Sequence, residues 1–163
     1  MKISNHVIQD VEMRPSPNSG GIITPRLVVI HYTGDNSLEG ALDWLTTPES
    51  QVSAHLLNGK AGELYQLVPF NVRAWHAGRS EWNDQPNVNG FSIGIENVGY
   101  GDSWPGAQIA KLMDILEALV AAYAIEGIVG HEDICIPDGR KQDPGPNFPW
   151  SMVAAKWPKL VGA

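Results

Sequence analysis

Two histidines that lie far apart in the sequence each follow a short apolar segment. His31 comes after Val28-Val29-Ile30, and the short segment Ile128-Val129 leads to His131. Because side chains at the ends of neighbouring strands can converge at one edge of a sheet, these two imidazoles could bind one metal ion. Asp143, in a segment rich in proline and glycine, is the natural third ligand. Three protein ligands leave the fourth position of a tetrahedral zinc ion open for water, which is typical of a catalytic zinc site.

Cys135 competes with Asp143 for the position of third ligand, because it lies four residues after His131 and would share one face of a helix with it. The pair His131-Glu132 also matches the start of the H-E-x-x-H helix of zinc proteases. Pro137 and further turn-forming residues follow at once, so a stable helix is not expected here. We therefore interpret Cys135 as a small buried residue and keep a zinc protease as the weaker hypothesis.

Two charged residues are candidates for catalysis beside such a metal. Glu96 lies on the same face of a predicted strand as Ser92 and Gly94, whose small size leaves space around it. A carboxylate near an activated water could take its proton and pass it to a leaving amine, so Glu96 is the best candidate for the general base. Lys141 lies two residues before Asp143, and in an extended segment both side chains would face one site.

Three aromatic residues fit contact with a substrate better than a metal. His55 lies in a predicted hairpin strand, and Trp75 and His76 lie in a polar and aromatic loop. By composition alone either histidine could also be a ligand. The flat face of a tryptophan suits stacking against a sugar ring, although a tryptophan can equally close a small core.

The hydrophobic pattern predicts the elements that would position these residues. Continuous or alternating apolar residues and a glycine-containing turn predict strands over residues 27–32, 52–58, 63–68, 91–98 and 128–129. Apolar residues at helical spacing predict helices over residues 37–46, 107–123 and 150–157. This mixture predicts an α/β fold in which one domain, residues 1–163, has a mixed central β-sheet flanked by helices.

Composition excludes several classes of function. The formal net charge of −7 at pH 7 argues against nucleic acid as a partner and against electrostatic binding to anionic membranes. No run approaches the ~20 apolar residues of a membrane span, and the first residues lack the apolar core of a signal peptide. We expect a protein that is cytoplasmic as synthesised and that could reach a cell wall by a separate export or lysis route. The sequence predicts no oligomeric state.

Taken together, the motifs resemble the zinc-dependent N-acetylmuramoyl-L-alanine amidases of the amidase-2 type, relatives of the peptidoglycan recognition proteins and the phage lysozyme-amidases. The matching segments occur in the family's order and span about residues 27–150: they are 29–33, 53–55, 73–78, 92–96 and 130–146. The resemblance implies a zinc ion held by His31, His131 and Asp143. It also implies Glu96 and Lys141 as catalytic partners and a groove lined partly by His55, Trp75 and His76.

The activity that the resemblance implies is hydrolysis of the amide bond between N-acetylmuramic acid and L-alanine in peptidoglycan or muropeptides. Some relatives carry a catalytic tyrosine just before the hairpin histidine; Ala54 stands there in this chain, which would leave more of the work to Glu96. The alternative is a peptidoglycan-binding module without activity, although such modules often lack a metal ligand that this chain keeps. A phage endolysin or other bacteriolytic enzyme is slightly favoured over a recycling amidase or a delivered effector.

Overall fold

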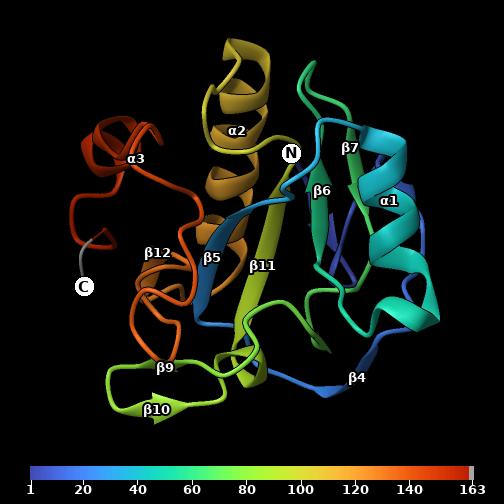
Figure 1. The fold of residues 1–163 in the computed structure, drawn as a ribbon, viewed down its shortest axis with the longest axis horizontal. Coiled ribbons are helices and arrows are strands. Elements are labelled where there is room, and N and C mark those ends of the chain that lie inside the picture. Colours follow the sequence, from blue (N-terminus) through green and yellow to red (C-terminus); the bar gives the residue numbers. More distant parts are fainter. Residues whose placement is uncertain (162–163) are drawn as a thin grey trace.

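A mixed six-stranded sheet forms the centre of the computed structural model, which describes residues 1–161 (Figure 1). The strand order across the sheet is β12-β5-β11-β6-β7-β3. The strands are β3 (Glu12–Met13), β5 (Leu27–Tyr32), β6 (Leu56–Asn58), β7 (Leu64–Gln66), β11 (Ser92–Asn97) and β12 (Gly127–Gly130). All neighbouring strands are parallel except β6 and β7, which form the predicted antiparallel hairpin. The predicted mixed sheet is confirmed.

Shorter elements surround this sheet. Three antiparallel pairs join β1 (Ile3–Ser4) to β2 (Val7–Ile8), β4 (Ser19–Ile22) to β8 (Val72–Ala74), and β9 (Glu81–Trp82) to β10 (Gln85–Pro86). Two short 3₁₀ helices are η1 (Pro48–Ser50) and η2 (Val88–Gly90). The loop between β8 and β9 reaches the functional site. The pair β4–β8, at the start of this loop, and the helix η2 are therefore the short elements that matter most here.

The three α-helices occur where the apolar spacing predicts them, within two residues at each end. They are α1 (Leu38–Thr46), α2 (Gly106–Ala122) and α3 (Trp150–Lys156). Ser37 caps α1, because its hydroxyl oxygen accepts a hydrogen bond from the backbone N–H of Gly40 at 2.9 Å. None of the helices in residues 1–161 is long and apolar enough to cross a bilayer.

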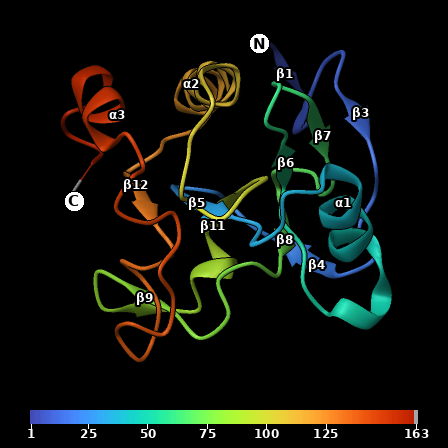
Figure 2. The same cartoon turned by 45° about the horizontal axis from the view of Figure 1, so that its top comes forward.

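Alternation along the central strands divides the core between the two faces of the sheet. Val28 and Ile30 of β5 pack with Ile93 and Ile95 of β11 under the apolar stripe of α2, which covers this face (Figure 2). The hairpin strand β6 alternates in the same way. Leu56 packs in the cluster under α2, whereas Leu57, on the other face, packs in a cluster with Ala41 and Leu45 of α1. Val28 and Ile30 are thereby completely buried.

The opposite face carries the polar residues. His31 lies on this face, as do the other odd-numbered residues of β5, and Ser92 and Glu96 project to the same side from β11. The parallel register places Glu96 directly beside His31, and Gly130 beside Ile30. His131, the next residue after β12, therefore lies next to His31 at the carboxyl edge of the sheet, as the sequence predicts.

Candidate metal centre

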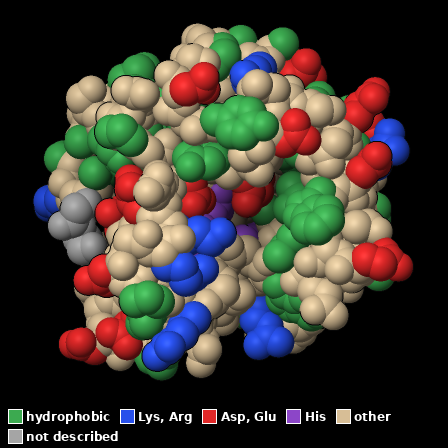
Figure 3. Space-filling view, viewed as in Figure 1, with side chains coloured by type: hydrophobic (Ala, Val, Ile, Leu, Met, Phe, Trp, Pro, Cys, Tyr) green, Lys and Arg blue, Asp and Glu red, His purple; other side chains and the backbone are tan. Residues whose placement is uncertain are grey.

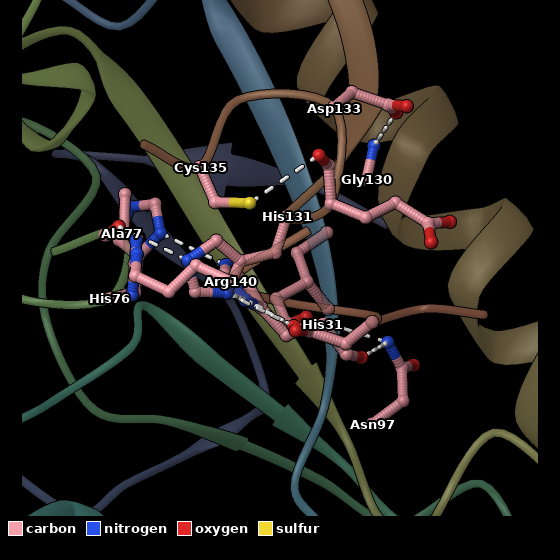
Figure 4. Close-up of polar contacts among 12 residues, drawn as sticks. His31, His76, Ala77, Asn97, Gly130, His131, Asp133, Cys135 and Arg140 are labelled. Atoms are coloured by element: carbon pink, nitrogen blue, oxygen red, sulfur yellow. Dashed lines mark hydrogen bonds and ion pairs between the residues drawn. The ribbon is translucent and has the colours of Figure 1, made fainter. Parts of the chain in front are cut away.

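Two imidazoles meet at the carboxyl ends of β5 and β12. His31 and His131 are 1% and 3% exposed, and their Nδ1 atoms lie 3.0 Å apart (Figure 4). The main chain of His31 is held by Asn97, whose amide donates to the His31 carbonyl oxygen at 2.8 Å. This contact holds the main chain of His31 at the carboxyl end of β5.

Asp143 completes the group from the loop that precedes α3. Its Oδ2 atom lies 2.9 Å from His31 Nδ1 and 3.1 Å from His131 Nδ1. The loop is fastened to the end of β12 because the backbone N–H of Glu132 donates to the Asp143 carbonyl oxygen at 2.9 Å. His31, His131 and Asp143 form the one group of potential metal ligands found within residues 1–161.

The hydrogen bonding of these residues fits a bound cation. His131 Nε2 lies 3.1 Å from the carbonyl oxygen of Ala77, which can only accept, so Nε2 carries a hydrogen and Nδ1 is the nitrogen that faces Asp143. Burial lowers the pKa of His31 from 6.5 to about 4, so that this ring is neutral at pH 7. Two imidazole nitrogens and one carboxylate converge here, and a positive charge between them would stabilise the group. Two imidazoles and a carboxylate are ligands that zinc accepts, and tetrahedral zinc separates its ligand atoms by about 3.3 Å.

Glu96 lies beside this group and lines the cavity above it. Burial raises the pKa of its carboxyl group well above 4.5; the negative charge of Asp143 raises it further, and the positive charge of Lys141 opposes the rise. Its Oε2 atom is buried and has no hydrogen-bond partner among residues 1–161. A carboxylate with a raised pKa is a stronger base, which is what proton transfer from water requires.

A cavity of about 670 Å³ opens above the three ligands. In the space-filling view its floor shows histidine and carboxylate side chains, with cationic side chains gathered on one rim and apolar ones on the other (Figure 3). The lining includes Trp44, Trp75, Glu96, Arg140, Lys141 and Asp143. A volume of this size suits a ligand as large as a small glycopeptide.

The expected substrate residues separate into two groups. Trp75 and His76 line the cavity, although His76 is only 8% exposed. His55 does not: it is fully buried, its Nδ1 accepts from the backbone N–H of Gly94 at 3.0 Å, and its Nε2 lies 2.9 Å from the carbonyl oxygen of Val72. The expected substrate contact of His55 is therefore corrected to a structural role, because the ring lies just before β6 and hydrogen-bonds to Gly94 of β11 and Val72 of β8.

Cys135 is buried and stands apart from the ligand group, as its size and sequence context indicate. Its Sγ atom lies 3.5 Å from the carbonyl oxygen of Glu132. Residues 131–135 form turns and no α-helix, so the arrangement of an H-E-x-x-H protease is absent there. The competing third ligand and the protease hypothesis both fail on this geometry.

One cavity residue that the sequence reasoning missed is Trp44. It is 59% exposed on α1 and reaches the rim of the cavity. The signal was present, since Trp44 stands outside the apolar stripe of an amphipathic helix, where a large aromatic side chain has no core to fill. Arg140 was missed as well; its guanidinium donates to the carbonyl oxygens of Ala77 and Arg79 at 3.2 and 2.8 Å and so secures the cationic rim.

Two buried histidines and a carboxylate at the edge of a mixed sheet form a candidate metal site, and a glutamate lies beside it. The chain belongs to the amidase-2 family of N-acetylmuramoyl-L-alanine amidases, whose sequence model matches residues 22–146. The family that the motifs predict is thus confirmed.

Two curated relatives come from Escherichia coli K12. N-acetylmuramoyl-L-alanine amidase AmiD is 38% identical over 157 residues, which are 82% of this chain and 55% of AmiD. The 1,6-anhydro-N-acetylmuramyl-L-alanine amidase AmpD is 37% identical over 148 residues, 78% of this chain and 80% of AmpD. The chain thus spans about half the length of AmiD and most of AmpD.

Solved structures agree with this assignment. A selenomethionine derivative of AmpD matches with a TM-score of 0.83 and 31% identity, covering 95% of this chain and 98% of the other. A complex of E. coli AmiD with the substrate anhydro-N-acetylmuramic acid-L-Ala-D-γ-Glu-L-Lys matches with a TM-score of 0.75 and 35% identity, covering 92% and 62%. The predicted α/β fold of the amidase-2 type is confirmed.

Proposed function

We propose that this chain is a zinc-dependent N-acetylmuramoyl-L-alanine amidase that hydrolyses the amide bond between N-acetylmuramic acid and L-alanine. The observation that carries the proposal is the convergence of His31, His131 and Asp143 beneath an open cavity, with Glu96 beside them. Membership of the amidase-2 family supports the same activity. A module that only binds peptidoglycan would have no use for a glutamate with a buried, unpartnered oxygen atom next to a metal site.

The three ligands, Glu96 and Lys141 have separate roles in the proposed reaction. His31, His131 and Asp143 would hold the zinc ion, which would supply Lewis-acid polarisation and acidify water. Glu96 takes the proton from the attacking water and delivers it to the nitrogen of the departing L-alanine. Lys141, on the rim of the same cavity, faces the negative charge that develops on the carbonyl oxygen; one well-placed donor is typically worth about 3–4 kcal/mol in such a transition state.

The substrate class follows from the cavity and from the relatives. Trp44 and Trp75 offer flat faces for sugar rings, while Arg140 and Lys141 offer positive charge to the carboxylates of a peptide stem. AmpD is named for the 1,6-anhydro sugar, and AmiD was solved with an anhydromuropeptide. We therefore favour soluble anhydromuropeptides over intact wall as the substrate, in contrast to the slight preference for a bacteriolytic enzyme in the sequence analysis.

Mass spectrometry of products tests both parts of this proposal. The purified protein is incubated with zinc and either anhydro-N-acetylmuramyl tripeptide or purified sacculi, and the products are compared with those of Asp143→Ala. We expect free tripeptide and anhydro-N-acetylmuramic acid from the soluble substrate, with slower release from sacculi. No cleavage of either substrate by zinc-loaded protein would reject the activity, and faster cleavage of sacculi would reject the substrate preference alone.

A further inference from the structure

A chain of buried side chains leads away from the metal centre on the side opposite to the ligand atoms. His31 Nε2 lies 3.0 Å from His76 Nδ1 (Figure 4), and His76 Nε2 lies 3.1 Å from the hydroxyl of Ser92. That hydroxyl lies 2.7 Å from the carbonyl oxygen of Val88 in η2. All three side chains are at most 8% exposed, so water does not compete for these contacts.

The last member of the chain fixes the direction of every hydrogen bond. The Val88 carbonyl can only accept, so the hydroxyl of Ser92 donates its one hydrogen there. The Ser92 oxygen must then accept from His76 Nε2–H. No carboxylate of residues 1–161 hydrogen-bonds to His76, so this ring is neutral and its Nδ1 carries a lone pair. That lone pair accepts from His31 Nε2–H, which leaves His31 Nδ1 without a hydrogen.

We infer that His76 and Ser92 are positioning residues that fix the tautomer of His31, so that its Nδ1 offers a lone pair to the metal. This inference rests on the proposed zinc-dependent function. His131 is fixed differently, by the main-chain carbonyl of Ala77. One histidine ligand therefore depends on a backbone group that substitution cannot remove, whereas the other depends on two side chains that can be replaced singly.

The surrounding backbone is built to hold this arrangement. The side-chain oxygen of Asn89 accepts from the backbone N–H groups of His76 and Ala77 at 3.1 and 2.8 Å, so one amide secures the partners of both histidine ligands. Gly94 leaves the space that the His76 ring fills, since a Cβ atom at that position would lie 2.4 Å from His76 Cγ. Two independent features thus place His76 against His31.

Zinc affinity of the loaded protein, measured by competition with a chromophoric chelator, tests the inference without reference to activity. His76→Leu fills the space but cannot accept, whereas His76→Asn is smaller but keeps an acceptor near the position of Nδ1. Loss of a hydrogen bond behind a ligand typically weakens metal binding about 10–100-fold, which we expect for His76→Leu. We expect His76→Asn to bind more tightly than His76→Leu; the reverse order would show that the residue only fills space.

Ser92→Ala provides the second variant, with Ser16→Ala as its matched control. Ser16 is also buried and donates to a backbone carbonyl, that of Leu45 at 2.6 Å, and no hydrogen bond joins it to His31 or His76. We expect Ser92→Ala to weaken zinc binding and Ser16→Ala to leave it unchanged. Equal zinc affinities for the two variants would contradict the role of Ser92.

The wild-type protein gives a direct spectroscopic answer that needs no variant. Long-range ¹H–¹⁵N correlation spectra of the zinc-loaded protein distinguish the two tautomers of each histidine. We expect His76 with its hydrogen on Nε2, and a hydrogen on Nδ1 would overturn the inference. If wild-type protein takes up no zinc, the proposed function itself fails; if it binds zinc and His76→Leu binds equally well, only the positioning role fails.

Discussion

Two carboxylates lie within one site, and their surroundings give them different tasks. Asp143 is held between two imidazoles at 2.9 and 3.1 Å, an arrangement that suits a permanent ligand. Glu96 has a buried oxygen without a partner in the described chain, and burial raises its pKa well above 4.5. Environment, and not residue type, therefore separates the proposed metal ligand from the proposed base.

Replacing the base should remove turnover and leave the metal in place. Because Glu96→Gln keeps the shape of the side chain but cannot take a proton, we expect the rate of amide hydrolysis to fall roughly 10²-fold or more. The zinc content of the purified variant should equal that of wild type. Glu132→Gln is the matched control, since Glu132 lies beside His131 but does not line the cavity; if this control lost more activity than Glu96→Gln, Glu96 would not be the base.

His55 should make stability depend on pH. Burial lowers its pKa from 6.5 in the unfolded chain to about 4 in the folded protein, so the unfolded state binds the proton more readily. The folded protein is therefore favoured most above pH 6.5 and loses roughly 3 kcal/mol from this residue as the pH falls to about 4.

His55→Gln separates this contribution from that of the other histidines. Glutamine does not titrate in this range and can still donate to the carbonyl of Val72. Urea denaturation of both proteins with a metal chelator present, at several values between pH 4 and pH 7, should show a flatter pH dependence for the variant. Parallel curves for the two proteins would mean that His55 is not responsible.

At the scale of elements, parallel strands β12, β5 and β11 deliver their side chains to one edge of the sheet. The register that pairs Glu96 with His31 also places Ser92 and Gly94 on the same face, beneath the loop that carries His76. Small residues at alternate positions of β11 thus make room for functional side chains, while Ile93 and Ile95 on the other face bury the strand against α2.

A methyl group on β11 should disturb the site through packing. The Cβ of Gly94→Ala would lie 2.4 Å from His76 Cγ, so the ring must move away from its position against His31. We expect a loss of about 1–3 kcal/mol in the free energy of unfolding, as is typical of overpacking, together with weaker zinc binding. Urea denaturation and chelator competition measure the two effects.

Gly20→Ala is the matched control for this prediction. Gly20 also lies in a strand, β4, but a Cβ atom there would meet nothing within 4 Å. We expect near wild-type stability and zinc affinity for the control. A Gly94→Ala protein that behaves like Gly20→Ala would show that the His76 ring has freedom that the packing does not suggest.

At the scale of the whole molecule, the metal centre joins segments that are distant in sequence. His31 and Asp143 are 112 positions apart, and the second belongs to a loop that leads to α3. A ligand that binds only the folded state stabilises it by about 4 kcal/mol at a thousandfold excess over its Kd. Zinc should therefore stabilise the fold as well as enable the reaction.

Removal of the metal tests this coupling. Thermal denaturation followed by circular dichroism should give a lower Tm with excess chelator than with zinc, and added zinc should restore it. Asp143→Ala, which lacks one ligand, should show a much smaller response to either addition. A zinc-dependent shift of equal size in wild type and Asp143→Ala would place the stabilising metal elsewhere.

The amino-acid sequence by itself determined the α-helices, most of the central strands and the candidate ligands. Apolar spacing predicted α1, α2, α3 and five of the six central strands, because burial of one face requires a regular period; β3 has only two residues and was not predicted. The same pattern indicated His31 and His131, since each directly ends or follows a buried strand. The family followed from the order of the motifs.

Only the tertiary structure decided how the imidazoles are used. His55, His76 and His131 are the same residue type but have different partners. His55 joins strands, His76 contacts His31, and His131 contacts Asp143. The sequence cannot distinguish them, because the direction of a ring and the partners of its two nitrogens depend on strands that pair across many residues. Trp44 illustrates the same point, since the cavity that it borders exists only once α1 has packed near the carboxyl edge of the sheet.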